Sequence, residues 1–317
     1  MAAGTAVVQS KPTPGRLRES RSEALAGYAL IAIPMALFLI LNIGSIIYAL
    51  FISFFEWGPR GPRDFLGTEN YADVLGDRVF LKAVTNTVYY AFVWVPITMA
   101  LGLMLAVIVN AKIRGQTFFR AAFYFPAIAS SAAITVLWIF LLDPNGLFNA
   151  LRQVFPFPGL FALLGFADNH NWVGHSSTAL NSIVVLNAWT TSGTFMLFYL
   201  ASLQTISHEV YEAAAIDGAG TWDTFWRITF PLLKPGHYFV ATVAVIGALQ
   251  IFDQAIIAGG ASGEPNNALT TMVLYLYREA IAEFNFGYAA AVGMVLFLIV
   301  FTATVVQRRL FGQAPSW

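Results

Sequence analysis

The sequence predicts an all-α membrane protein, from its composition and from the length of its apolar segments. Of its 317 residues, 58% are hydrophobic and only 11% are charged, with a mean hydropathy of +0.67. A soluble globular domain carries about 25% charged residues, so this chain lacks the polar surface that folding in water requires. Apolar segments of about 20 residues, the length of a helix that crosses a bilayer, recur along the chain. The alternating segments of about ten residues that build a membrane β-barrel are absent from the sequence.

Six segments are long and apolar enough to be transmembrane helices. Pro34 and Pro96 fall inside the first two, which neighbouring helices in a bundle can tolerate. Residues 1–24 are polar and predict a flexible tail. The apolar run after them is about 30 residues, longer than the 7–15 of a cleaved signal peptide. The predicted spans are residues 25–55, 83–110, 118–142, 179–203, 238–258 and 287–306, within one transmembrane domain at 25–311 that precedes a short tail at 312–317.

The loop at 143–178 contains an apolar stretch that is too interrupted to be a seventh span. Pro156, Pro158 and Gly159 break the stretch Leu147–Phe166. This pattern predicts a helix lying at the membrane interface.

The distribution of Lys and Arg predicts the orientation, because cytoplasmic loops are enriched in both. With the N-terminus inside, eleven of the 17 basic residues fall in cytoplasmic segments and six fall in outer loops. Both termini are therefore predicted to be cytoplasmic. The eleven inner residues are Lys11, Arg16, Arg18, Arg21, Lys112, Arg114, Arg120, Arg227, Lys234, Arg308 and Arg309.

The residues and motifs of common catalytic centres are missing. There is no cysteine, and 17 basic residues balance 17 acidic ones, which gives no sign of a nucleic-acid partner. Neither a G-x-S-x-G nucleophile turn nor an H-E-x-x-H zinc pair occurs. His170 and His175 are five residues apart, a poor spacing for one helical face, and are expected to be solvated. No phosphate-binding glycine loop is present, so if transport through this bundle is driven by ATP, another chain must bind the nucleotide. We expect no catalytic residue, metal or cofactor in this chain.

The loop at 204–237, between the fourth and fifth spans, predicts a helix, a turn and a second helix. Ser207 can cap the first helix, and Glu209 is favourable at its positive end. Gly218 can adopt the left-handed conformation that ends it, and Thr221 can cap the second helix. On this pattern alone, an ordinary amphipathic helix at the headgroup boundary is an equal alternative.

The same loop resembles the EAA loop of bacterial ABC-transporter permeases. The family pattern is E-A-A, three residues, G, nine residues, I, one residue, then L-P, and only the Leu position differs here, where Phe230 stands. The resemblance implies a cytoplasmic coupling helix that docks on a nucleotide-binding subunit, with Glu212, Ala213, Ala214 and Gly218 as its docking face. The matching residues are Glu212, Ala213, Ala214, Gly218, Ile228 and Pro231.

Looser similarity over nearly the whole chain points to the maltose- and glycerol-phosphate-type sugar permeases. It rests on Arg120, Pro126, Trp138, Asn145, Gly146 and Asn149, and on Ile251–Gln254, Gly259, Gly260, Thr270 and Leu274–Tyr277. The resemblance implies a six-helix permease in a bacterial inner membrane. It implies as partners a second homologous permease, two ATP-binding subunits and an extracytoplasmic sugar-binding protein. A permease for a non-sugar solute and a stand-alone secondary transporter are the alternatives. A membrane-embedded enzyme or assembly factor is a third.

Polar residues inside predicted spans are costly and therefore suggest a substrate pathway. Asn, Gln and Asp can bind sugar hydroxyls, while Tyr and Trp offer flat apolar faces. We expect the second, fourth and fifth spans to line an aqueous cavity, the fifth through one helical face that carries Gln250, Asp253, Gln254 and Ile257. Interhelical packing is the alternative for these residues, and Asp253 can equally be solvated at the outer boundary. The candidates are Asn86, Tyr89, Asn187, Trp189, Gln250, Asp253 and Gln254, with Tyr90 at a comparable depth.

Overall fold

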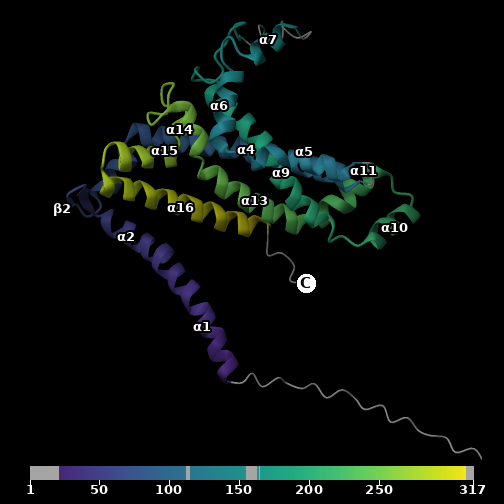
Figure 1. The fold of residues 1–317 in the computed structure, drawn as a ribbon, viewed down its shortest axis with the longest axis horizontal. Coiled ribbons are helices and arrows are strands. Elements are labelled where there is room, and N and C mark those ends of the chain that lie inside the picture. The colour runs from purple at the N-terminus through teal and green to yellow at the C-terminus, as the bar shows by residue number, and fades with distance from the viewer. Residues whose placement is uncertain (1–20, 112–114, 155–162, 164, 312–317) are drawn as a thin grey trace, which may run out of the picture. The chain divides into compact units, whose positions relative to one another are not determined.

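A computed structural model describes residues 21–111, 115–154, 163 and 165–311 (Figure 1). The predicted tails therefore lie almost wholly outside the described residues. The chain divides into two compact units, residues 1–48 and 49–317, with α2 crossing their boundary.

The described part of the first unit is an apolar helix. It consists of α1 (Arg21–Phe38), the π-helical turn η1 (Leu39–Gly44) and the start of α2 (Ser45–Ile52). Pro34 lies inside α1. Residues Ala24–Ile52 are long and apolar enough to cross a membrane. The predicted span at 25–55 is thus helical as far as Ile52.

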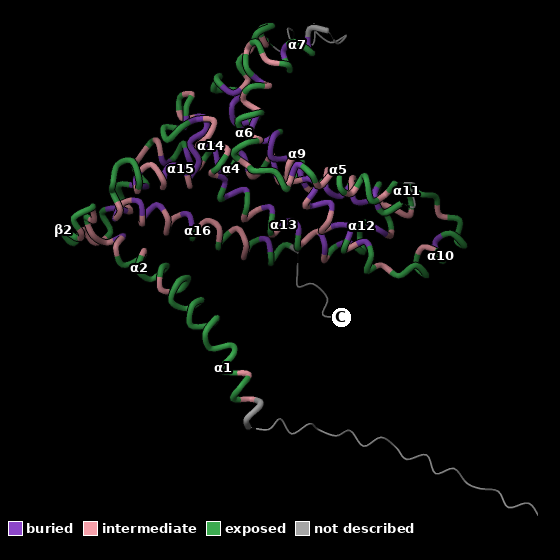
Figure 2. The backbone as a smooth tube through the Cα atoms, in the orientation of Figure 1, coloured by how far each residue is buried: buried purple, intermediate pink, exposed green. Residues whose placement is uncertain are grey.

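Four long helices form the centre of the second unit. They are α4 (Arg78–Asn110), α9 (Ala179–Leu203), α13 (Lys234–Leu249) and α16 (Phe286–Phe311). α4 packs along α9, and α13 lies against α4, α9 and α16, so the buried residues lie between these helices (Figures 1 and 2). A Cβ on Gly102 would lie 2.6 Å from Phe195 Cβ, so the glycine lets α4 and α9 approach closely.

The predicted third span is a broken pair of helices, a correction to the continuous helix expected at 118–142. α5 (Gln116–Ile128) and α6 (Ser131–Leu141) meet at an angle of 92°. Pro126 lies in the last turn of α5 and removes a backbone donor just before the break. The described residues thus contain five helices suited to span a membrane, or six if this pair counts as one.

The predicted fifth span is also interrupted, which corrects the single helix expected at 238–258. α13 ends at Leu249, residues Gln250–Phe252 are not helical, and α14 (Asp253–Gly259) follows. The Thr271 hydroxyl donates to the Ile251 carbonyl at 2.8 Å, so a backbone group freed by the break has a partner.

Shorter elements join the long helices. An antiparallel hairpin of β1 (Phe55–Gly58) and β2 (Gly61–Phe65), which was not predicted, precedes α3 (Glu69–Gly76). α7 (Leu147–Val154) covers the first part of the predicted interface helix, and most of the remainder lies outside the described residues. α15 (Met272–Tyr277) and the π-helical η3 (Arg278–Ala282) precede α16.

The 204–237 loop folds into four short helical segments. α10 (His208–Ile216) is followed by a turn, and then by α11 (Thr221–Thr224), η2 (Phe225–Thr229) and α12 (Phe230–Leu232). α13 then begins at Lys234. The predicted helix–turn–helix is therefore present.

Candidate functional site

A polar cavity of about 330 Å³ lies where α13 breaks. It is bounded by α4, by α9 and by the non-helical residues between α13 and α14. A second hollow of about 200 Å³ shares Asn187, Thr191 and Gln254 with it and reaches the break between α5 and α6. The residues lining the larger cavity are Tyr90, Trp94, Asn187, Thr191, Phe195, Val243, Gly247, Gln250, Ile251, Phe252, Asp253 and Gln254.

A hydrogen bond joins the two broken helices at this site. The Gln254 amide on α14 donates to the Ser131 hydroxyl at the start of α6, at 2.7 Å. Breaks in membrane-spanning helices are tolerated where the freed backbone groups face a cavity or buried protein. The two breaks thus belong to one polar region.

An aromatic pair on α4 forms one wall of the larger cavity. Tyr90 and Trp94 are one helical turn apart, and their rings stack at 5.7 Å with an angle of 14° between planes. Asn187 on α9 donates to the Tyr90 hydroxyl at 2.8 Å. Trp94 is 5% exposed, and within the described chain its Nε1 has no hydrogen-bond partner. This wall therefore combines flat apolar rings with polar groups, as a sugar requires.

The charge around the cavity is low. Asp253 is the one ionisable acid among the residues that line either hollow, and in the described chain no Lys, Arg or His lines them. Asp253 is exposed, so it can remain ionised without a buried partner. Such a lining suits an uncharged polar solute.

Four of the predicted pathway residues meet at this cavity. Asn187 is buried on α9, Gln250 and Asp253 are exposed at the break, and Gln254 is half-buried on α14. Their meeting has a different cause from the one expected. The helix break, rather than one continuous helical face, brings the three residues of the fifth span together, and Ile257 does not line the cavity.

The three other predicted pathway residues do not line the cavity. Asn86 is buried and donates to the carbonyls of Asn267 and Thr270 at 2.8 and 2.9 Å, so it anchors the segment before α15. The Tyr89 hydroxyl donates to Asn181 Oδ1 at 2.8 Å on an exposed surface. Trp189 lines a separate apolar hollow between α4, α5 and α9.

Trp94 was not predicted from the sequence as a pathway residue, and Tyr90 was named only as a residue at a depth comparable to that of the seven candidates. Asn86, Tyr90 and Trp94 are spaced by four residues and so share one face of α4. A helical-face comparison of this span would therefore have found the aromatic wall. Thr191 on α9 lines both hollows.

The turn in the 204–237 loop has the backbone geometry expected. The Ser207 hydroxyl accepts from the Glu209 amide at 3.2 Å, and Gly218 has φ +75°. The second helix differs from the prediction, because Gly220 occupies its N-cap and Thr221 is its first helical residue.

The predicted docking residues of this loop differ in accessibility. Glu212, Ala213 and Gly218 are exposed, as is Pro231, while Ile228 is half-buried. Ala214 differs from them, because it is only 6% exposed in this conformation. The motif comparison also missed two large apolar side chains, Ile216 and Trp222, which are 86% and 73% exposed.

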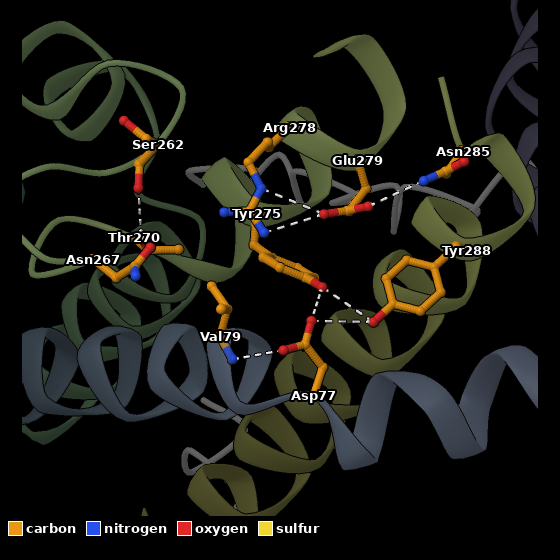
Figure 3. A network of polar contacts seen from close by, with 10 residues as sticks. All are labelled: Asp77, Val79, Ser262, Asn267, Thr270, Tyr275, Arg278, Glu279, Asn285 and Tyr288. Carbon is orange, nitrogen blue, oxygen red and sulfur yellow. Dashed lines mark hydrogen bonds and ion pairs between the residues drawn. The ribbon is translucent and has the colours of Figure 1, made fainter. Parts of the chain in front are cut away.

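A polar network at the start of α4 holds three elements of the bundle together (Figure 3). Asp77 caps α4 by accepting from the Val79 amide at 2.7 Å, and its other oxygen accepts from the Tyr275 hydroxyl. Tyr288 on α16 is hydrogen-bonded to Tyr275 at 3.1 Å. Glu279 pairs with Arg278 at 3.2 Å. The network therefore connects α4 with α15 and α16.

Asp77 and Tyr275, which lie outside the membrane-spanning helices, both have shifted pKa values. Burial alone would raise the pKa of Asp77, but the bonds from Tyr275 and two backbone amides, with Arg278 nearby, hold it below its usual value. Burial, followed by the hydrogen bond to Asp77, raises the pKa of Tyr275 well above its usual value. Asp77 is therefore favoured as a carboxylate.

Comparison with known families identifies one match that covers most of the chain. Residues 74–311 match the family described as the binding-protein-dependent transport system inner membrane component. This region contains both helix breaks, the polar cavity and the 204–237 loop.

Individual relatives are similar over nearly their full length. A probable ABC transporter permease of Bacillus subtilis, YurN, is 32% identical, with 89% of this chain and 94% of the relative covered. The multiple sugar-binding transport system permease MsmF of Streptococcus mutans is 31% identical, with 90% and 94% covered. A solved bacterial ABC transporter involved in the import of alginate has the same fold, with a TM-score of 0.76 at 21% identity, over 93% of this chain and 99% of that one.

Proposed function

The chain belongs to the family of binding-protein-dependent transport system inner membrane components, and we propose that it forms half of the pathway of an ATP-driven sugar importer. A second homologous permease supplies the other half. Two ATP-binding subunits and an extracytoplasmic sugar-binding protein complete the complex. In this arrangement both termini and the 204–237 loop are cytoplasmic.

The polar cavity at the helix breaks carries this proposal. Its aromatic wall can pack against the C–H faces of a sugar ring. Asn187, Gln250 and Gln254 supply amide donors and acceptors for hydroxyl groups. Relatives named for multiple sugars, arabino-oligosaccharides and lactose support a sugar as the solute.

Exposure and backbone geometry support the 204–237 loop as the docking element. Glu212, Ala213 and Gly218 lie on its accessible side, and Ile216 and Trp222 add exposed apolar area that a partner protein could bury. No Cβ added at Gly218 would meet another atom within 4 Å, so the turn leaves room for a partner to approach.

In the proposed mechanism, ATP binding and solute passage take place on different chains. ATP binding closes the partner subunits, and the docked loop carries this motion into the bundle. The cavity then opens outward and receives sugar from the binding protein. ATP hydrolysis resets the complex. This chain contributes the pathway and the docking loop, and ATP and Mg bind the partner subunits.

ATP hydrolysis stimulated by sugar tests the pathway. The complete complex in lipid nanodiscs is titrated with lactose or with arabino-oligosaccharides in the presence of its binding protein. Asn187→Ala and Gln250→Ala should raise the sugar concentration that gives half-maximal stimulation. Tyr89→Phe, which lies on α4 outside the cavity, is the control. Wild-type concentration dependence in both cavity variants would refute the assignment.

A further inference from the structure

A chain of aromatic contacts leads from the exposed surface of the 204–237 loop into the bundle. Trp222 contacts Trp226 with ring centroids 5.7 Å apart, and Trp226 contacts Phe230 at 5.2 Å. Phe230 contacts the His237 ring at 4.5 Å, and His237 contacts Tyr199 at 5.3 Å. Exposure falls along the chain from 73% at Trp222 to 1% at Tyr199. The contacts therefore connect a surface residue with the core of α9.

His237 is the central member because it bonds to both neighbours. Its Nε2 lies 3.2 Å from the Phe230 carbonyl oxygen, and its Nδ1 lies 3.1 Å from the Tyr199 hydroxyl. The carbonyl can only accept, so Nε2 carries the hydrogen. In the neutral ring Nδ1 is then an acceptor, and the Tyr199 hydroxyl donates to it. The imidazole thus fastens α12 to α9 in a defined orientation.

α9 also carries the polar residues of the cavity. Tyr199 and Asn187 are twelve residues apart on this continuous helix, which corresponds to about 18 Å along its axis. A displacement of α9 at Tyr199 would therefore move Asn187 and Thr191. The rings lie in contact from the loop surface to a helix that lines the cavity.

We propose that His237 is a positioning residue that couples the 204–237 loop to α9, so that movement of the loop changes access to the cavity. The proposal rests on the proposed function, since it assumes that ATP-binding subunits dock on the loop. It assigns a role to a residue outside the E-A-A motif. The Phe230 and Tyr199 side chains act as its two contacts.

A thiol-accessibility experiment on the assembled complex tests this role without a known substrate. The chain has no cysteine, so Thr191→Cys creates one reactive site in the cavity. A membrane-impermeant methanethiosulfonate is the probe, and mass spectrometry of this chain gives the labelling rate. Rates are compared with and without ATP and vanadate, and trapped nucleotide is measured in the same samples.

Three variants and one matched control are placed in the Thr191→Cys background. His237→Gln retains an amide near Nε2, His237→Asn retains one near Nδ1, and Tyr199→Phe removes one hydroxyl. Phe239→Leu is the control, because Phe239 contacts Phe198 at 5.2 Å between α13 and α9, the helices that carry His237 and Tyr199.

We expect nucleotide to change the labelling rate when His237 and Tyr199 are intact. Each of the three variants should reduce that nucleotide effect at least about twofold, within the range by which intermediate residues alter coupling. Trapped nucleotide should stay at the wild-type level, and Phe239→Leu should keep the wild-type effect. A purely structural role would lower assembly and trapping together.

An unchanged nucleotide effect in His237→Gln and Tyr199→Phe, with nucleotide trapped normally, would overturn the proposal for His237. Two other results would contradict the proposed function itself. One is that ATP-binding subunits fail to co-purify with the chain. The other is that the chain with Thr191→Cys alone shows no effect of nucleotide on the labelling rate.

Discussion

Gly218 illustrates how one backbone conformation can support docking. Its φ of +75° lies in the left-handed region, where a side chain costs about 1–2 kcal/mol and a β-branched one more. The adjacent space is open, so backbone strain rather than a clash limits substitution. The glycine thus fixes the direction in which the chain leaves α10.

Gly218→Val should leave the protein in the membrane but reduce co-purification of the ATP-binding subunits or sugar uptake per ATP hydrolysed. Gly220→Ala is the matched control, since Gly220 has φ −71° and also faces open space. Membrane content, co-purified subunits and uptake are measured together. Normal co-purification with wild-type uptake in Gly218→Val would contradict a docking role for this turn.

Asp77 gives a pH-dependent prediction. Its pKa is lowered in the folded state, so its carboxylate stabilises the fold above the unfolded pKa of about 3.9, and this contribution is lost as pH falls below that value. Asp77→Asn should lower the free energy of unfolding at pH 7 by about 1–2 kcal/mol, because it weakens charge-assisted hydrogen bonds. Thermal unfolding in detergent at several pH values measures this. An equal difference between the proteins at pH 3 and pH 7 would contradict it.

At the scale of elements, continuous spans could be predicted and broken ones could not. The fourth span was expected at 179–203 and α9 occupies Ala179–Leu203, because one uninterrupted apolar run sets its limits. At the break after Leu249, the carbonyl of Ile251 accepts a hydrogen bond from the hydroxyl of Thr271, which lies 20 residues beyond Ile251 in the chain. The pattern of apolar residues does not reveal contacts between residues far apart in the sequence. The fifth span was therefore predicted as one continuous helix.

The same limit applies to the candidate site. Residue type alone selected Asn187, Gln250, Asp253 and Gln254, because polar groups in a span are rare. Residue type could not distinguish these residues from Asn86, whose amide donates to the carbonyls of Asn267 and Thr270. Such a distinction requires knowledge of the tertiary contacts.

Thr271→Val tests the interruption between α13 and α14. It removes the donor to the Ile251 carbonyl and the cap on the Leu274 amide, both buried, at nearly constant volume. A buried unpaired polar group costs about 1–3 kcal/mol, so the free energy of unfolding should fall by at least that much. Thr85→Val, which loses one exposed bond within α4, should change it by less than about 0.5 kcal/mol. Equal effects of the two substitutions would show that the Thr271 bonds do not hold the break.

At the scale of the whole molecule, the cavity and the loop proposed to dock lie at different places along the bundle. The polar cavity lies at the helix breaks, and the 204–237 loop connects the opposite ends of α9 and α13. In the described chain no group of three or more His, Cys, Asp or Glu residues could hold a metal ion. The arrangement suits a permease that passes motion along its helices to a solute pathway.

Cross-linking from the 204–237 loop in the assembled complex tests the docking of this loop most directly. Ala213→Cys, on the exposed side of α10, carries a photoactivatable maleimide, and Glu69→Cys on α3 serves as the control. We predict that illumination joins the Ala213→Cys chain to an ATP-binding subunit, and that the Glu69→Cys chain gives no such product. Adducts only with lipid from Ala213→Cys, in a complex that retains its ATP-binding subunits, would contradict docking at this loop.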